Sequence, residues 1–444
     1  MNRPAPAPNR IAYALRALRH RNFRLFTFGQ SISLVGTWMQ QVAVGWLVYR
    51  LTESPLLLGV VAFVAQGPSF FLAPLSGVFA DRYEKRRIVL VTQVVMMVQA
   101  LSLAALVLSD QVTIGWIVVL MAVLGAATGF DIPARQSFLI EMVGDRDDLP
   151  NAIALNSSMF NAARLVGPAI AGVAVALVGE GWVILLNGLS YVAVIASLLL
   201  MRVPTPHRRS HQGEVFRHML EGFRYAYHAV PIRLLLTLVA ATSLVGAPFS
   251  VLLPVVARET LGGGPETLGL LMSAVGLGAL GGALFLASRS SVVGLGRVIA
   301  GGALLFGSAL VGTALSQVLW LTLPLLMAAG FGMMSQMAAC NTVLQTIVED
   351  DKRGRVMSLY TMAFIGTAPL GSLLLGAAAD RVGTAATIAA GGAVVIGAGA
   401  LFGSRLPLIR RHVRPIYERL GIIPEVARGI QAATQLTTPE PEDG

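Results

Sequence analysis

The chain has 444 residues, of which 55% are hydrophobic and only 13% are charged, and its mean hydropathy is +0.71. A water-soluble domain cannot bury this much apolar surface, so the composition indicates a polytopic membrane protein. The formal net charge of +10 does not indicate a nucleic-acid partner, because the basic residues gather at the ends of apolar runs and form no single basic stripe with interleaved aromatics.

Apolar runs of about 18 or more residues recur along the chain, and each is long enough to cross the lipid core as a helix. Membrane strands would need a closed barrel and an alternating pattern, which the sequence lacks. The sequence therefore predicts an all-α membrane protein with twelve transmembrane helices. The predicted spans are residues 25–49, 56–80, 88–109, 113–134, 152–178, 182–201, 234–257, 267–287, 298–316, 318–340, 356–379 and 384–403.

Lysine and arginine are distributed unevenly between the two sides of the predicted membrane. Of the 33 basic residues, 29 fall at one set of alternating loops and ends, and the opposite set holds only Arg50, Arg258 and Arg381. Arg164 alone lies inside a span. The positive-inside rule then places both termini in the cytoplasm, in a multi-pass protein of the cell (inner or plasma) membrane.

The longest interior loop separates spans six and seven and divides the chain into two halves. Within it, Phe216, Met219 and Tyr227 recur at helical spacing, which predicts an amphipathic helix on the inner membrane surface. The predicted organisation is a cytoplasmic N-terminal segment 1–24, a six-helix bundle 25–201, a cytoplasmic linker 202–233, a second six-helix bundle 234–403, and a cytoplasmic, partly disordered tail 404–444.

The two halves resemble each other. IEMVGDRDDLPNAIALN (140–156) links spans four and five, and QTIVEDDKRGRVMSLY (345–360) links spans ten and eleven. Both segments place acidic residues before a helix start at equivalent points. Two parallel six-helix repeats form one class of transporter, with the binding site in a central cavity between the repeats.

The loop between spans two and three, GVFADRYEKRR (77–87), carries the most informative motif. With twelve spans, duplicated halves and this loop, the chain resembles the major facilitator superfamily along essentially its whole length. The family pattern is G-x-x-x-D-R-x-G-x-R-R, with Glu84 here in place of the usual second glycine. The matching residues are Gly77, Asp81, Arg82, Arg86 and Arg87.

The resemblance implies that Asp81 belongs to a gate between the halves. It would dock near the start of span eleven, around residues 353–356, and on Arg135 in span four. In the alternative interpretation these charges only set topology. That explanation suits residues 85–87 but accounts poorly for Asp81.

Span five contains ARLVGPAIAG (163–172), which resembles the G-x-x-x-G-P-x-x-G-G motif of exporters and antiporters in this superfamily. Gly167, Pro168 and Gly172 match it, Arg164 lies within it, and alanines replace two of its glycines. Ordinary packing of small residues is the alternative. The segments FDIPARQSFLIEMV and NAIALNSSMFNAARLVGP further resemble the branch that includes enterobactin exporters and macrolide-efflux-type permeases, and lysophospholipid transporters resemble them too.

Two charged positions inside the predicted spans need an explanation, because ionisable groups are costly in lipid. Asp131 and Arg135 are four residues apart and can pair on one helical face. An Asp131 that changes partner could carry a proton, whereas a permanent pair would be structural only. Arg164 could meet Asp131 or Glu141 across a helix interface.

In the family, spans one, four, seven and ten line the substrate cavity. Amides, thioethers and aromatics in spans one and ten suit a large, partly apolar ligand, although each alone also suits packing. Closely spaced acids are missing, so a neutral, zwitterionic or anionic substrate fits at least as well as a strongly cationic one. The candidates are Trp38, Gln40, Gln41, Phe331, Met334, Gln336 and Asn341.

The sequence favours a proton-coupled exporter of a small molecule, such as a drug-like compound, siderophore or other amphiphile, working by alternating access. The alternatives are a lysophospholipid or lipid translocator, a small-solute uptake permease, and a non-transporting receptor or scaffold. No phosphate-binding loop, paired-histidine zinc signature or nucleophile elbow occurs, so we expect no enzyme, cofactor or metal. The expected partners are the bilayer, the substrate and protons, and we expect a monomer.

Overall fold

The computed structural model describes residues 15–202, 223–289 and 291–422. The first half contains α2 (Arg21–Thr52), α3 (Pro55–Arg82), α4 (Lys85–Leu108), α5 (Ile114–Val143), α6 (Leu149–Val178) and α7 (Glu180–Leu200), with the short turns η1 (Arg16–Arg19) and η2 (Arg146–Asp148). The second half contains α9 (Val230–Ala241), η3 (Thr242–Gly246), η4 (Ala247–Leu252), α10 (Leu253–Val255), η5 (Val256–Thr260), α11 (Pro265–Ala287), α12 (Leu295–Leu315), α13 (Leu319–Ile347), α14 (Asp350–Thr361), η6 (Met362–Gly366), α15 (Thr367–Val382), α16 (Thr384–Ser404) and α17 (Leu406–Arg419).

Within the described residues, eleven continuous helical rods are long and apolar enough to cross a membrane. The elements from α9 to η5 form one of them, and α14, η6 and α15 form another. α2 adds a 32-residue rod that packs on α6 and α7. It is less apolar because it buries polar side chains inside the bundle, among them Gln30, Ser33 and Gln40. The predicted all-α membrane fold is confirmed.

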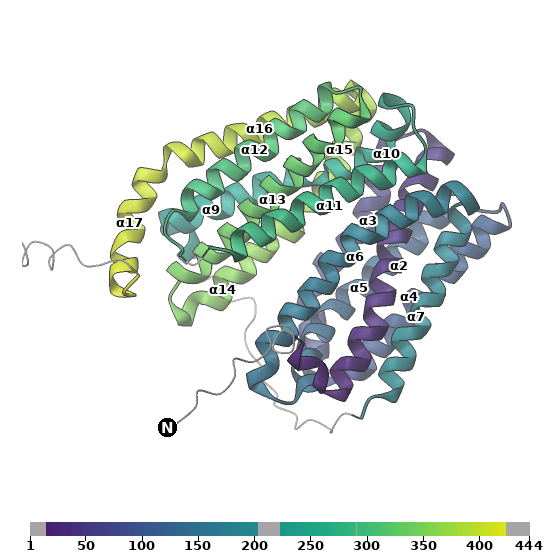
Figure 1. The fold of residues 1–444 in the computed structure, drawn as a ribbon, viewed down its shortest axis with the longest axis horizontal. Coiled ribbons are helices and arrows are strands. Elements are labelled where there is room, and N and C mark those ends of the chain that lie inside the picture. The colour runs from purple at the N-terminus through teal and green to yellow at the C-terminus, as the bar shows by residue number, and fades with distance from the viewer. Residues whose placement is uncertain (1–14, 203–222, 290, 423–444) are drawn as a thin grey trace, which may run out of the picture.

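The two bundles form a V (Figure 1). The first, purple to blue, and the second, teal to yellow, converge near α10 and α3 and diverge toward α14. Contacts between them run mainly along two helix pairs, α6 with α11 and α3 with α15. Gly179, between α6 and α7, and Gly383, between α15 and α16, have φ values of 85° and 90°, as expected at equivalent turns of two related repeats.

Two spans of the second half are interrupted where they approach the first bundle. The α9–η5 rod passes through π and 3₁₀ turns, with Pro248 in the 3₁₀ turn η4 and Pro254 in the short helix α10, and η6 inserts a π turn between α14 and α15. Proline lacks the N–H that an α-helix needs, so the hydrogen-bond ladder of the α9–η5 rod shifts at Pro248 and Pro254. The interruptions place η4 and α10 against α2 and α3.

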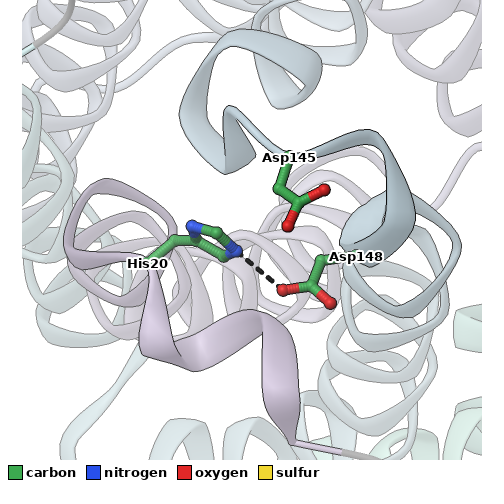
Figure 2. A group of neighbouring side chains, drawn as sticks. All are labelled: His20, Asp145 and Asp148. Carbon is green, nitrogen blue, oxygen red and sulfur yellow. Dashed lines mark hydrogen bonds and ion pairs between the residues drawn. The ribbon is translucent and has the colours of Figure 1, made fainter.

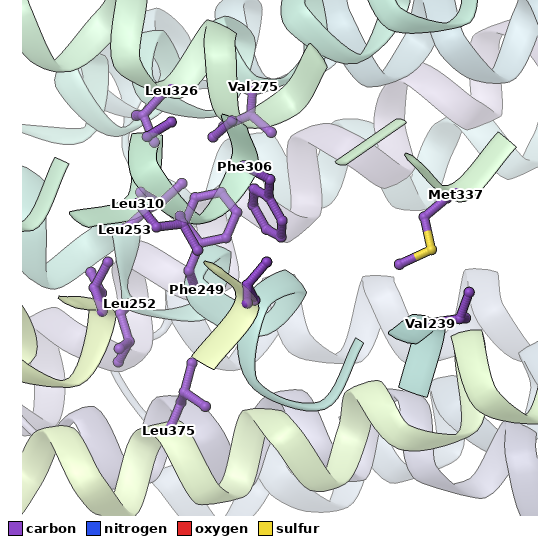
Figure 3. Packing of buried hydrophobic residues seen from close by; sticks show 14 of the residues in the cluster. Val239, Phe249, Leu252, Leu253, Val275, Phe306, Leu310, Leu326, Met337 and Leu375 are labelled. Carbon is purple, nitrogen blue, oxygen red and sulfur yellow. The ribbon is translucent and has the colours of Figure 1, made fainter. Parts of the chain in front are cut away.

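The core of the second bundle is densely packed apolar side chains (Figure 3). Phe249 and Phe306 are 1% and 0% exposed, and their ring centroids are 6.0 Å apart at 62°. Leu253 and Val275 belong to the same cluster. This packing fixes the wall that the second bundle presents to the first.

Two predicted segments at the bundle margins can be compared only in part. Most of the predicted amphipathic linker helix lies outside the described residues, although residues 223–228 are helical. α17 occupies the start of the segment expected to be a tail, and its Ile409 and Val413 are buried. It contacts α9, α13 and α16. Residues 423–444 of that tail also lie outside the described residues.

Candidate transport site

The bundles touch through two helix crossings with glycine on both sides. Gly172 of α6 faces Gly269 of α11, and Gly59 of α3 faces Gly376 of α15. A Cβ added to Gly172 would lie 2.9 Å from the Cα of Gly269, and one added to Gly59 would lie 3.1 Å from the Cα of Gly376. Both crossings are therefore backbone contacts that larger residues would force apart.

Polar contacts between the bundles surround these crossings. They lie at the end of the molecule where α6 and α15 end and where α3 and α11 begin, which we call the glycine-crossing end. The pairs are the Tyr49 hydroxyl donating to the Glu259 carboxylate, Arg258 with Glu53 at 3.8 Å, and the Ser54 hydroxyl donating to Asp380 Oδ1 at 3.1 Å. Glycine contacts and hydrogen bonds together hold this end closed.

A cavity of about 110 Å³ lies between the bundles. Drug-sized ligands usually occupy roughly 300–1,000 Å³, so this cavity has room for one group of such a molecule. α2 and α6 supply one wall, and η4, α10 and α11 supply the other. The lining residues are Trp38, Gln41, Arg164, Pro168, Ser250, Leu253, Met272 and Val275.

Arg164 is the only charged side chain among these lining residues, and the helix positions it near the middle of α6. Its guanidinium carbon lies 5.9 Å from the centroid of the Trp38 ring. Gly167 allows α2 this close, because a Cβ there would lie 2.6 Å from the Cβ of Trp38. Pro168 has no N–H to donate to the Arg164 carbonyl four residues earlier, so the regular α6 hydrogen bond is missing at this depth.

The prediction that Arg164 meets Asp131 or Glu141 is wrong. Asp131 pairs with Arg135, and Glu141 accepts from Lys85 Nζ at 2.6 Å. The reason is that α5 directs both acids into the first bundle, whereas Arg164 faces the second. In the described part of the chain no carboxylate pairs with Arg164.

The contacts of Arg164 therefore do not offset the cost of placing its charge inside the membrane. An arginine at the centre of a membrane helix costs at least about 2.5 to 3.5 kcal/mol. A cation–π contact returns roughly 0.5 to 2 kcal/mol, and 5.9 Å is near the limit of about 6 Å at which such contacts act. Trp38 therefore compensates this charge only in part.

Asp131 and Arg135 form the expected i,i+4 pair, with Arg135 Nε 3.0 Å from Asp131 Oδ2. Asp131 is 3% exposed, and its Oδ1 accepts from the Thr92 hydroxyl and the Gln93 amide, each at 3.0 Å. Both carboxylate oxygens are thus occupied by groups of α4 and α5. In this conformation the acid is fully paired inside one bundle.

The loop-two motif is described only in part. Gly77, Asp81 and Arg82 belong to α3, but the side chains of Asp81 and Arg82 lie outside the described residues, so the docking of Asp81 stays a prediction. Arg86 donates to the carbonyls of Leu198 and Leu199 at the end of α7 at 2.8 and 3.1 Å, and Arg87 pairs with Glu84. These two arginines contact their own bundle.

Other predicted substrate residues lie away from this cavity. Gln40 accepts from Asn187 at 2.6 Å inside the first bundle, and Gln336 donates to Thr242 at 2.8 Å inside the second. Phe331 packs on Phe285, Met334 lies against Gly282, and Asn341 accepts from Gln345. Of the seven predicted residues, Trp38 and Gln41 line the cavity.

Comparison with known proteins identifies the family. Residues 12–417 match the family described as transmembrane secretion effectors, within the major facilitator superfamily. The chain belongs to this family. It is a membrane transporter, and it is not an enzyme.

Curated relatives of this transporter are exporters and transporters of small molecules. It is 28% identical over 371 residues to the staphyloferrin A transporter of Staphylococcus aureus, covering 82% of this chain and 91% of the relative. It is 27% identical over 374 residues to the multidrug efflux pump Tap of Mycolicibacterium fortuitum, covering 82% and 91%. It is 25% identical over 388 residues to the enterobactin exporter EntS of Salmonella typhi, covering 85% and 91%. The predicted exporter branch is confirmed.

A solved structure agrees with the fold of this transporter. A bacterial homologue of the human lysosomal transporter Spinster, in an inward-facing and unoccupied conformation, matches with a TM-score of 0.61 at 14% identity. The match covers 93% of this chain and 99% of that one. At this identity the likeness supports the fold alone.

The structure of the transporter adds cavity residues that sequence reasoning missed. Ser250, Leu253 and Met272 come from η4, α10 and α11, and none lies in a recognisable motif. The prolines at 248 and 254 were the available signal, because they mark an interrupted helix, and interrupted membrane helices usually line sites.

A separate cluster joins the N-terminal turn of the transporter to the start of α6 (Figure 2). The ligand atoms of His20, Asp145 and Asp148 lie within 4.8 Å of one another, close enough to share a metal. However, Arg16 and Arg19 pair with Asp148 at 3.1 and 2.8 Å, and Arg19 also pairs with Asp145. These guanidinium groups oppose a further cation, so the cluster suits a structural clasp.

The ion pairs of the same cluster weaken at acid pH. The hydrogen bond from His20, at 2.7 Å, and the charges of Arg19 and Arg16 lower the pKa of Asp148 below its ordinary value. A carboxyl group whose pKa is lowered in the folded state stabilises the fold at any pH above its ordinary, unfolded-state pKa. That stabilisation is lost as the pH falls through the lowered pKa of the folded state. The clasp is therefore intact at neutral pH and weakens in acid.

Proposed function

We propose that this transporter exports small amphiphilic molecules from the cytoplasm in exchange for protons, by alternating access of a central site. The observation that supports this most directly is the cavity between two bundles that meet through glycine crossings at one end. Bundles joined in this way can rock about the site, because the crossings are close contacts without interlocking side chains.

The direction of transport rests on the relatives. The multidrug efflux pump Tap and the enterobactin exporter EntS are efflux proteins by name. The positive-inside distribution of 29 basic residues against three supports cytoplasmic termini. With that orientation, the diverging end of the V faces the cytoplasm, so the described conformation receives substrate from inside.

Proton coupling is assigned to the pair of Asp131 and Arg135. A proton on Asp131 must compete with Arg135 for Oδ2, at 3.0 Å, in a site that is 3% exposed. Both groups lie on α5, so rocking alone keeps them together, and it would change that competition only by bringing a group of the second bundle up to Arg135 or Asp131. Asp81 is proposed as the gate residue at the diverging end.

The test is transport into inside-out vesicles that contain the full-length protein. With an acid-inside gradient, we expect accumulation of at least one of three probes, ethidium, enterobactin and staphyloferrin A, and loss of accumulation when nigericin collapses the gradient. Empty vesicles are the control. Accumulation that survives nigericin would contradict proton coupling, and no accumulation of any probe would contradict amphiphile export.

A further inference from the structure

Among the described residues, Arg164 has no carboxylate partner, and it lines the cavity between the two bundles. It is the only charged group among the lining residues, and no described carboxylate pairs with it. Trp38 contacts it at the limit of the cation–π range. An ionisable group inside a membrane that has no protein partner points to a ligand as its partner.

The rest of the cavity wall completes a site for an anion attached to an apolar body. Gln41 offers an amide N–H and Ser250 a hydroxyl, both capable of donating to an oxyanion. Within the described part of the chain, the Ser250 hydroxyl has one contact, a 3.5 Å hydrogen bond to the Ala247 carbonyl, so it is available to a stronger acceptor. Guanidinium, amide and hydroxyl together match the two oxygens of a carboxylate.

The remaining lining residues are apolar, and two of them belong to the packed core of the second bundle. Trp38, Pro168 and Met272 line the cavity beside Arg164, and Leu253 and Val275 belong to the packed core of the second bundle (Figure 3). Such walls accept a flat ring edge or an alkyl group. Because the volume is about 110 Å³, the site receives one ring and its acid group, not a whole drug-sized molecule.

We propose that this cavity binds the carboxylate of an aromatic or similarly apolar substrate, with Arg164 as the residue that selects for negative charge. The inference rests on the proposed export function and names its substrate class. It also explains why both bundles contribute, since α6 supplies the cation while η4 and α11 close the other side.

The test measures binding to the purified full-length protein in detergent, without any gradient. Benzoate is the probe, benzamide its uncharged isostere, and benzamidine its cationic counterpart. We expect benzoate to raise the unfolding temperature in proportion to the logarithm of its concentration. We expect benzamide and benzamidine to leave the unfolding temperature unchanged.

Variants assign the effect to one side chain. Arg164→Gln should abolish the benzoate shift, and Arg164→Lys should keep a reduced shift because it keeps the charge but loses the fork of donors. Exposed Arg297 supplies the matched control, and Arg297→Gln should respond like wild type. Without ligand, Arg164→Gln should melt no lower than wild type, because it removes an unpaired charge from a desolvated site.

Three results would overturn the proposal. They are equal shifts with benzamide and benzoate, a full benzoate shift in Arg164→Gln, and a shift with an anionic lysophospholipid where benzoate gives none. The wild-type comparison of the three probes decides the question even if Arg164→Gln does not fold. Because no gradient is used, these results are separate from failure of export in vesicles.

Discussion

At the scale of single residues, variants of Asp131 can distinguish two roles of its pair with Arg135, proton coupling and a purely structural ion pair. Asp131→Asn removes the negative charge and leaves Arg135, whose side chain is 20% exposed, without its partner. Because roughly 3 to 5 kcal/mol is the cost for a fully buried pair, the loss here should be smaller. The double variant Asp131→Asn with Arg135→Gln removes both charges and should recover most of that loss. We expect the double variant to fold, to exchange probe down its gradient, and to have lost the response to pH.

The measurement is probe flux in vesicles with and without a pH gradient, beside the unfolding temperature. Thr92→Val is a matched control, because it removes one hydrogen bond to Asp131 Oδ1 and leaves the charge in place. A double variant that still couples flux to the gradient would show that the pair is structural and that the proton travels elsewhere.

The same residues show what sequence can reveal at this scale. The pairing of Asp131 with Arg135 was predictable, because i,i+4 neighbours face each other on any helix. The surroundings of Arg164 were not, since they depend on which face of α6 turns toward α11. That choice is made by tertiary contacts, such as the Ser273 hydroxyl donating to the Leu165 carbonyl at 3.3 Å.

At the scale of helices, the α6–α11 crossing predicts a specific sensitivity to size. A methyl group at position 172 would lie 2.8 Å from the Pro265 carbonyl oxygen, and backbone atoms cannot yield as side-chain ends do. Overpacking of this kind costs about 1 to 3 kcal/mol. We therefore expect Gly172→Ala to disfavour the closed glycine-crossing end and to reduce export about tenfold, as roughly 1.4 kcal/mol implies.

Gly301 provides the control for this prediction, because a Cβ added there meets no atom within 4 Å. Gly301→Ala should leave export unchanged and stabilise the helix by up to about 1 kcal/mol. Export rate and unfolding temperature are the two measurements. Equal behaviour of the two alanine variants would mean that the crossing does not set the conformational equilibrium.

Helix existence was easier to predict than helix interruption. The spans follow from the length of the apolar runs alone, because a helix must be apolar over about 20 residues to cross the lipid core. The π turn η3 does not, since it depends on neighbours such as Gly371, where a Cβ would lie 2.0 Å from the Leu244 carbonyl oxygen. α17 was also missed, because LPLIRRHVRPIYER is strongly polar in sequence and only packing of Ile409 and Val413 buries its apolar side.

At the scale of the whole molecule, the two glycine crossings are counterparts under the internal repeat. Each joins the late part of one helix to the early part of another, with Gly172 of α6 against Gly269 and Gly376 of α15 against Gly59. Alternating access then requires both crossings to separate when the glycine-crossing end opens. A covalent link across this end should therefore stop transport.

The hydrogen bond from Ser54 to Asp380 marks a place for such a link, since 3.1 Å separates the two side-chain oxygens across the bundles. In a Cys340→Ala background, which removes the one native thiol, Ser54→Cys with Asp380→Cys can be joined by a short, reducible bifunctional thiol reagent. We expect the joined protein to lose export, and a reductant to restore it, because the bundles are then free to rock again.

The control uses the same end of the molecule within one bundle. Arg50 Nε and Glu180 Oε1 lie 2.7 Å apart between α2 and α7, so Arg50→Cys with Glu180→Cys, joined by a reagent long enough to replace these two longer side chains, gives a link that stays inside the first bundle. Export should survive that link. If the Ser54–Asp380 link left export intact, substrate would be crossing while the glycine-crossing end stays shut, and rocking of two rigid bundles would be the wrong mechanism. If both links stopped export, the loss would reflect rigidity inside the first bundle, and comparison of partial with complete linking would show which pair limits the rate.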